Sequence, residues 1–416
     1  MHPDYRTQLD RLQRFGIHLG LERVRALLHR LHDPQTQFPV IHVGGTNGKG
    51  SVSAFLSEIL HAAGYRVGRY TSPHLIDWPE RIWLDGAYIA PERLQACLER
   101  VSAICAELPI DLGVPTQFEV FTCAAFVYFA EERLDIAVIE VGLGGRLDAT
   151  NVFEHPLVSV LTGISLEHCD RLGDTLAAIA TEKAGILRPG RPLVSAPLPE
   201  EASRVVHERA RALDVPVLIA PPALGTAPGR CYWQGFDYDL FLSGDVQLQN
   251  SATALQVCRV LRTQGWNLSE KSLRTGIAAT NWPGRYQWVG DYLLIDGAHN
   301  PEAAARLRAY LDSHRPGESV CWLIGMLETK DARSILGALL RAGDTVMTVP
   351  IAGVASHSPR SLSEIARLYE GIEAQDYPSL EEGLAEVERR RTGLSVLCGS
   401  LYLVGEYFVY AHRPNS

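Results

Sequence analysis

The chain has 416 residues, with 39 Lys plus Arg against 48 Asp plus Glu, a formal net charge of −9 and 46% apolar residues. At roughly 150 residues per domain this length predicts two or three domains, and the acidic balance excludes a general nucleic-acid binder, which needs a basic face. No apolar run approaches the ~18 residues of a membrane span, and the polar start MHPDYRTQLD is unlike a secretory signal peptide.

The cysteines favour a reducing compartment. There are eight, at positions 97, 105, 123, 169, 231, 258, 321 and 398. None forms a C-x-x-C pair, and most lie in apolar surroundings. We therefore expect reduced thiols in a cytoplasmic protein, without a zinc site.

Apolar strands alternate with helices in the first half of the chain. The predicted strands are residues 39–45, 65–72, 135–142 and 156–164, and the predicted helices are residues 51–64 and 118–134. Apolar residues recur at helical spacing in the first helix, whereas the second is apolar nearly all round. Unbroken apolar strands between helices predict a parallel sheet covered on both faces.

Residues 213–250 have a different pattern. The short strand-like pieces VPVLIA and YWQGFDYDLFL are interrupted by Pro and Gly, which predicts a small antiparallel patch. A helix is predicted over 250–265. The segment NWPGR that follows predicts a boundary, with a first domain over 1–281, a linker over 282–285 and a second domain over 286–416.

A second alternation of strands and helices begins after this boundary. The predicted strands lie at 292–296, 319–326, 344–351 and 394–400, and the predicted helices lie at 301–311, near 361–370 and near 379–391. This pattern is typical of a Rossmann-like unit. The fold class is therefore α/β: a phosphate-loop (P-loop) parallel-sheet domain with a small antiparallel patch, followed by a C-terminal Rossmann-like α/β domain.

The segment GGTNGKGS, residues 44–51, lies between a predicted strand and a predicted helix, as a phosphate-binding loop must. Its glycines allow backbone N–H groups to turn toward phosphate oxygens, and the helix N-terminus favours an anion. Val43 and Gly50 depart from the strict Walker pattern. A ligand-free turn remains the alternative, but it does not account for Lys49 and Ser51. The residues predicted to bind ATP here are Thr46, Asn47, Gly48, Lys49, Gly50 and Ser51.

Several further segments resemble one known family. They are VIHVGGTNGKGSVSAFL, YTSPHL, ERI, EVGLGGRLDATN, EKAGIL, PGR, DGAHNP and GSLYLVGE. In this order they are similar to the bacterial folylpolyglutamate synthase and dihydrofolate synthase family, which belongs to the Mur-ligase-like superfamily of ATP-dependent amide ligases. The resemblance spans nearly the whole chain.

The resemblance implies two Mg²⁺ sites. Glu140 ends a predicted parallel strand, where a carboxylate faces the ligand crevice, and Mg²⁺ prefers hard oxygen ligands. A buried, paired glutamate is the alternative. By resemblance, Glu140 and Ser72 hold one Mg²⁺ between the β- and γ-phosphates, and His168 binds the second. Glu167 precedes this histidine where the family usually has Asp.

Lys183, in TEKAGIL, is by itself compatible with a solvated helix lysine. The resemblance implies instead that it is carbamylated and supports the second metal. A carbamate presents oxygen ligands in place of a cation. The catalytic residues that the resemblance implies are thus Lys49, His168 and Lys183.

The remaining implied contacts concern the nucleotide and the folate. Arg285 and Asp296 are expected to hold ATP from the C-terminal domain, together with Asn250, which is also a plausible helix N-cap. The implied folate-binding residues are Thr116, Gln117, Phe118, Glu119, Leu147, Asp148 and Ala149. A place in the core is the alternative for Phe118.

The implied activity is ATP-dependent ligation of L-glutamate to dihydropteroate, to the polyglutamate tail of a folate, or to both, through an acyl phosphate. The C-terminal domain would carry glutamate, and a monomer is expected. One alternative is a Mur-type amino-acid ligase acting on another carboxylate substrate. Such ligases carry an extra UDP-sugar-binding domain before the phosphate loop, and we expect the 43 residues before Gly44 to be too few for it. The other alternative is a non-catalytic nucleotide-binding regulator, which intact Lys49, Glu140, His168 and Lys183 disfavour.

Overall fold

The structure is a computed structural model that describes residues 4–13, 20–390 and 393–412. It divides into two compact units. Unit 1 comprises Met1–Pro73, Asp77–Phe241 and Gln247–Thr280, and unit 2 comprises His74–Ile76, Leu242–Val246 and Asn281–Ser416. Within the described ranges, no helix combines the length and the apolar character needed to cross a membrane.

Unit 1 is built on an eight-stranded sheet in the order β4-β3-β2-β5-β1-β6-β7-β8. Its strands are β1 (Val40–Gly44), β2 (Val67–Tyr70), β3 (Ile82–Leu84), β4 (Ala87–Tyr88), β5 (Ile136–Glu140), β6 (Val158–Leu161), β7 (Leu193–Ser195) and β8 (Val217–Ile219). The run from β2 to β8 is parallel, and β3 and β4 add an antiparallel edge. The predicted parallel sheet is confirmed.

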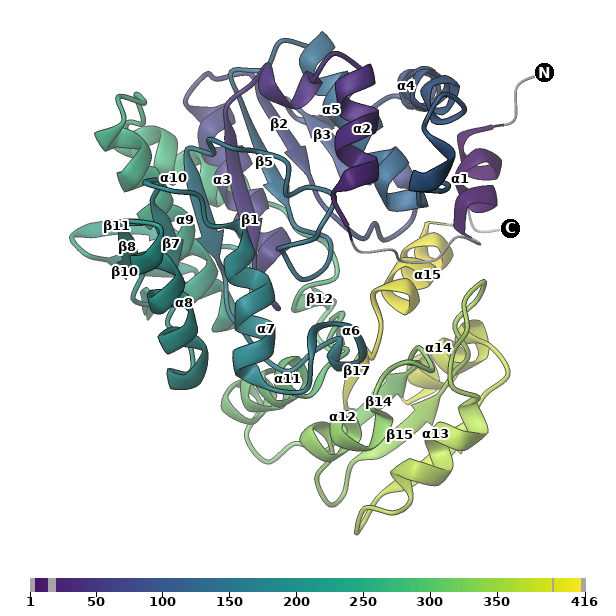
Figure 1. Ribbon diagram of the computed structural model, residues 1–416. Coiled ribbons are helices and arrows are strands. Elements are labelled where there is room, and N and C mark those ends of the chain that lie inside the picture. The colour runs from purple at the N-terminus through teal and green to yellow at the C-terminus, as the bar shows by residue number, and fades with distance from the viewer. Residues whose placement is uncertain (1–3, 14–19, 391–392, 413–416) are drawn as a thin grey trace. The chain divides into compact units, whose positions relative to one another are not determined.

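Helices cover both faces of this sheet. The helices of unit 1 are α1 (Tyr5–Gln13), α2 (Glu22–Arg30), α3 (Lys49–Ala62), α4 (Pro91–Cys105), α5 (Gln117–Glu131), α6 (Cys169–Leu172), α7 (Leu176–Lys183), α8 (Glu200–Ala212), α9 (Val246–Thr263) and α10 (Glu270–Ala279). Successive side chains of a strand point to opposite faces. Arg69 of β2 accordingly donates to Ser57 Oγ of α3 at 3.0 Å, whereas the next residue, Tyr70, bonds Thr122 Oγ1 of α5 at 2.9 Å. Helices α3 and α5 therefore lie on opposite faces of the sheet (Figure 1).

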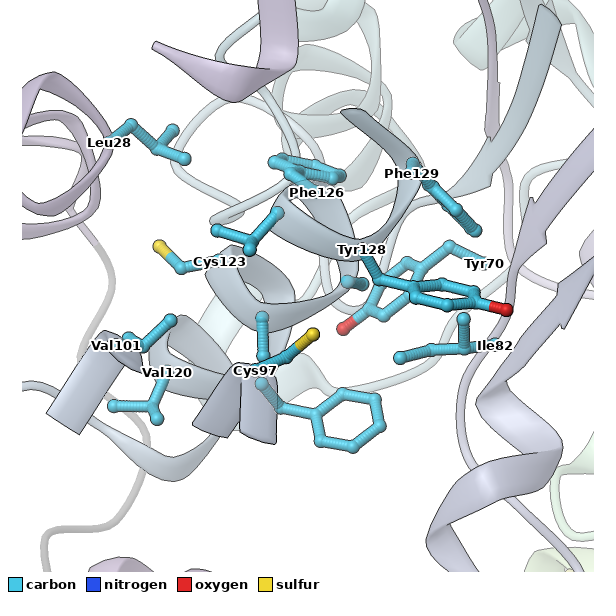
Figure 2. Close-up of a cluster of buried hydrophobic side chains, with 14 of the residues drawn as sticks. Leu28, Tyr70, Ile82, Cys97, Val101, Val120, Cys123, Phe126, Tyr128 and Phe129 are labelled. Carbon is cyan, nitrogen blue, oxygen red and sulfur yellow. The ribbon is translucent and has the colours of Figure 1, made fainter. Parts of the chain in front are cut away.

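Helix α5 is buried along most of its length. Its residues from Glu119 to Phe129 are all buried. Figure 2 shows part of the cluster around it, where Phe126 and Phe129 lie near Tyr70 of the sheet. Helices α1, α2 and α4 contact its other sides, which explains why the sequence of α5 lacks a polar face.

A separate three-stranded antiparallel sheet consists of β9 (Leu224–Ala227), β10 (Arg230–Trp233) and β11 (Phe236–Asp239). Gln234 and Gly235 both have positive φ in the two-residue turn between β10 and β11, as tight hairpins require. The predicted antiparallel patch is confirmed, but the assignment of VPVLIA to it is wrong. This segment forms β8, which pairs parallel with β7 through Leu218 and Val194.

Unit 2 contains a six-stranded sheet in the order β12-β13-β17-β14-β15-β16, of which β12 is antiparallel and the rest are parallel. The strands are β12 (Gln287–Val289), β13 (Leu293–Ile295), β14 (Val320–Ile324), β15 (Thr345–Thr348), β16 (Glu373–Asp376) and β17 (Leu394–Cys398). The helices are α11 (Pro301–His314), α12 (Ala332–Leu339), α13 (Pro359–Ala366), α14 (Leu380–Arg389) and α15 (Leu401–Ala411). Trp322 and Leu323 of β14 enter two different apolar clusters, so both faces of this sheet are covered.

Candidate active site

The segment predicted to bind phosphate forms a tight loop between β1 and α3. Gly45 and Gly48 have φ of +138° and +88°, which other residues rarely adopt. A Cβ on Gly45 would lie 2.2 Å from Thr162 Oγ1, and one on Gly48 would lie 2.4 Å from Asn250 Oδ1. Helix α3 has no side-chain cap at Gly48, so its first N–H groups are suited to an anion.

Two lysines bond backbone carbonyls of this loop. Lys49 Nζ donates to Thr46 O at 2.9 Å, and Lys183 Nζ donates to Gly45 O at 2.7 Å. An ammonium group has three N–H donors, so the bond to Thr46 leaves Lys49 with capacity for phosphate oxygens. The structure therefore brings Lys183, 138 residues away in sequence, directly to the loop.

Asn250 also lies at this loop. Its Nδ2 donates to Gln247 Oε1 at 2.9 Å, and Gln247 Nε2 donates to Ser51 Oγ at 3.4 Å. Because α9 begins at Val246 and not at 250, Asn250 is inside the helix, and its interpretation as an N-cap is wrong. Gln247 was not among the residues predicted for the site, although it lies one helical turn before Asn250 on the same face.

Glu140 and Ser72 lie together at the carboxyl ends of adjacent strands. Glu140 ends β5 and is paired in register with Val43 of β1, while Ser72 follows β2 and its backbone N–H donates to Glu140 Oε2 at 3.2 Å. Both side chains offer hard oxygens, which fit Mg²⁺. Among the residues that the structure describes, no three His, Cys, Asp or Glu side chains form a metal-binding group.

His168 and Lys183 occupy neighbouring segments of unit 1. His168 precedes α6 with a left-handed φ of 52°, and its Nε2 lies 3.9 Å from Glu167 Oε1. Lys183 ends α7 and is only 5% exposed. Burial, reinforced by repulsion from Lys49 and opposed by Glu167, lowers the pKa of Lys183 to about 7.

The segment that contains PTQFE has mainly internal contacts. Thr116 caps α5 by accepting from Glu119 N at 3.2 Å, and Glu119 Oε2 accepts from Thr116 N at 2.7 Å. Arg23 Nε lies 3.1 Å from both Glu119 oxygens, and Gln117 Nε2 donates to Leu9 O at 2.9 Å. The carboxylate of Glu119 is thus engaged in holding this helix start.

Phe118 lies against Gly142, where a Cβ would be 2.4 Å from its ring. Asp148 is buried, and it accepts from Leu143 N at 2.7 Å and from Thr150 Oγ1 at 2.6 Å. Burial raises the pKa of Asp148, and these hydrogen bonds oppose the rise. Ala149 is also buried, whereas Leu147 and Phe118 are half-buried. Folate contacts by these residues stay a prediction.

In unit 2, the residues predicted to hold ATP lie beside each other. Asp296 follows β13, and its oxygens accept from Tyr286 N at 3.0 Å and Ala298 N at 2.8 Å. Burial raises the pKa of Asp296, and Arg285 opposes this rise. A Cβ on Gly297 would lie 2.8 Å from an Arg285 nitrogen. Asp296 therefore organises the loop that follows β13.

A strand, a glycine-rich phosphate loop and a helix, with a carboxylate at the end of the adjacent strand, define unit 1 as a nucleotide-dependent phosphoryl-transfer domain. Comparison with known proteins gives the particular family. Residues 290–410 match the family model described as "Dihydrofolate synthetase, C-terminal domain".

Relatives match over nearly the full chain. The chain is 33% identical to the "Probable dihydrofolate synthetase" of Schizosaccharomyces pombe, over 95% of this chain and 98% of that protein. It is 35% identical to the "Folylpolyglutamate synthase" of Lacticaseibacillus casei, over 96% and 95%. The structure of "E.coli FolC in complex with DHPP and ADP" matches with a TM-score of 0.87 at 30% identity, over 99% of each chain. The chain belongs to the folylpolyglutamate synthase and dihydrofolate synthase family of ATP-dependent ligases.

Proposed function

We propose that the chain joins L-glutamate to dihydropteroate and also to the polyglutamate tail of tetrahydrofolate, in each case with conversion of ATP to ADP and phosphate through an acyl phosphate. The observation that carries the proposal is the phosphate loop beside the Ser72–Glu140 pair, at the carboxyl ends of neighbouring parallel strands. Complexes of the family member from E. coli with ADP and DHPP support the two ligand classes. All eight cysteines are unpaired, which supports a cytoplasmic location.

The reaction begins with attack of a substrate carboxylate oxygen on the γ-phosphorus of ATP. ADP departs, and the product is an acyl phosphate. Lys49 and the N–H groups at the start of α3 offset the charge on the transferring group. Ser72 and Glu140 would hold one Mg²⁺, and His168 with carbamylated Lys183 would hold a second; when bound, these ions supply positive charge to the phosphates.

The amide bond forms in the second step. The neutral amino group of glutamate attacks the acyl carbon. Phosphate then leaves with the carboxylate oxygen that attacked the γ-phosphorus in the first step, and the nitrogen loses a proton. Exclusion of water is required because water would otherwise hydrolyse the acyl phosphate. Nucleotide contacts by Arg285, Asp296 and Asn250 stay a prediction.

The acyl-phosphate step has a direct test. Dihydropteroate with heavy oxygen in its carboxylate should transfer one labelled oxygen to the released phosphate, as measured by mass spectrometry. The control reaction omits glutamate and should release little phosphate. Unlabelled phosphate, at full amide yield, would contradict the proposed order of bond formation.

A further inference from the structure

The segment after β6 runs alongside the phosphate loop in unit 1. Thr162 N donates to Gly44 O at 3.0 Å, and Thr46 N donates to Gly163 O at 2.8 Å. These bonds extend the β1–β6 pairing into the loop. The backbone of the phosphate loop is therefore held on one side by residues 162–165.

Two threonine hydroxyls reinforce this contact. Thr162 Oγ1 donates to Asn47 O at 2.7 Å. Thr46 Oγ1 accepts from Ser165 N at 3.1 Å and lies 3.3 Å from Ser165 O, to which it donates. Both threonines are buried, at 7% and 5% exposure. We name Thr46, Thr162 and Ser165 the loop clasp.

The bond from Thr162 fixes the direction of one peptide plane. In a trans peptide the C=O of one residue and the N–H of the next point in opposite directions. Because the carbonyl of Asn47 is held toward Thr162, the N–H of Gly48 is directed to the other side. Gly48 N–H belongs to the helix start that is suited to an anion.

We propose that Thr162 is a positioning residue for the nucleotide phosphates, acting through the Asn47–Gly48 peptide and not by contact with the nucleotide. This inference rests on the proposed ATP-binding function of the loop. The same segment leads to His168 six residues later. The clasp thereby links the position of the phosphate loop to the segment that carries a predicted metal ligand.

Thr162→Val tests this role because valine has the same shape but cannot donate a hydrogen bond. Its methyl group would also press against the Asn47 carbonyl. Loss of this bond should raise the Kd of ADP roughly tenfold, as measured by calorimetry with the full chain. Thr162→Ser keeps the hydroxyl and should bind ADP within about threefold of the wild type.

The matched control is Thr348→Val in unit 2. Thr348 is fully buried, and its Oγ1 donates to the backbone carbonyl of Pro359 at the same distance, 2.7 Å. Thr348→Val should lower the melting temperature about as much as Thr162→Val does, but it should not weaken the binding of ADP. The Kd of dihydropteroate should stay unchanged in every variant. If Thr162→Val does not fold, Thr162→Ala also removes the hydroxyl and carries the same expectation.

An ADP affinity of Thr162→Val or Thr162→Ala within about twofold of the wild type would overturn the inference. It would also be overturned if Thr162→Val weakened the binding of ADP and of dihydropteroate equally, or if Thr348→Val weakened ADP binding as much as Thr162→Val does. A Thr162→Ser variant that does not regain ADP affinity would overturn it as well. Each of these results would assign Thr162 a purely structural role. Failure of the wild-type chain to bind ADP would instead refute the proposed function itself, and this inference with it.

Discussion

Lys183 is buried beside the phosphate loop, and its substitution tests whether it is carbamylated. Its buried Nζ lies 2.7 Å from Gly45 O, and its pKa is lowered from 10.5 to about 7, first by burial and then by Lys49. At pH 7 about half of such amines are neutral, against roughly 0.04% at the ordinary lysine pKa. Only a neutral amine adds CO₂, so this environment raises the reactive fraction about 1,000-fold. The resulting carbamate keeps one N–H, which can still donate to Gly45 O.

The expected effect of Lys183→Ala is an activity loss of roughly 10–100-fold, the range seen when a group that supports a metal site is removed. Short carboxylic acids should partly restore activity by supplying oxygens in the vacated space. Lys183→Arg should be as impaired as Lys183→Ala, because a guanidinium keeps its charge and forms no carbamate.

The carbamate can be observed directly. Wild-type protein exchanged with isotopically labelled bicarbonate should show a carbamate NMR signal that is absent from Lys183→Ala. Removal of CO₂ at mildly acid pH should lower activity, and bicarbonate should recover it. A fully active, metal-loaded enzyme with an unmodified Lys183 amine would refute this reasoning, though not the ligase assignment.

The lowered pKa also predicts how stability depends on pH. Because the folded pKa lies below the unfolded value, the folded state binds fewer protons between the two, and stability rises with pH in this window. In CO₂-free buffer the free energy of unfolding should rise by about 2 kcal/mol from pH 7 to pH 9 through this one group. Lys183→Met should remove this rise. The free energies of unfolding are measured by urea titration at several pH values. An equal dependence on pH in the wild type and in Lys183→Met would show that the amine does not have the lowered pKa.

Three further predictions concern other parts of the chain. Lys49→Ala should abolish turnover with little change in melting temperature, because this lysine faces the phosphate loop; near-normal kcat would contradict the loop's assignment. Arg285→Ala and Asp296→Ala should each raise the Kd of ATP far more than that of dihydropteroate in calorimetry, and equal losses would argue against a nucleotide role. Asp344→Asn should destabilise unit 2 by about 3 kcal/mol in urea unfolding, because the carboxylate is buried and accepts from Arg308 Nη1 at 3.0 Å; a change below about 1 kcal/mol would contradict this.

The parts of the site that follow strand ends could be predicted from the sequence. An apolar strand that ends in Glu140, and another that ends in the glycine-rich loop, place both at the carboxyl edge of a parallel sheet. The register of Val43 with Glu140 confirms that placement. The proximity of Ser72 to Glu140 needed the family resemblance, because strand order is not contained in local periodicity.

Other parts could not be predicted because they depend on contacts between distant segments. Asn250 looked like a helix cap, since residues 246–249 (VQLQ) carry no helix start signal, and α9 nevertheless begins at Val246. The apolar segment VPVLIA could join either sheet, and pairing with β7 decided it. Thr162 lies in the unremarkable segment LTGI, and its bond to Asn47, 115 residues away, has no local sequence pattern.

The most direct test of the proposed activity is glutamate-dependent phosphate release, measured side by side with dihydropteroate and with tetrahydrofolate as acceptors. We predict that ATP is converted to ADP and phosphate with both acceptors, with one amide bond formed per phosphate, and only when glutamate is present. Release with one acceptor alone would restrict the enzyme to that activity. The absence of glutamate-dependent release with either acceptor would contradict the assignment as a folate-type glutamate ligase.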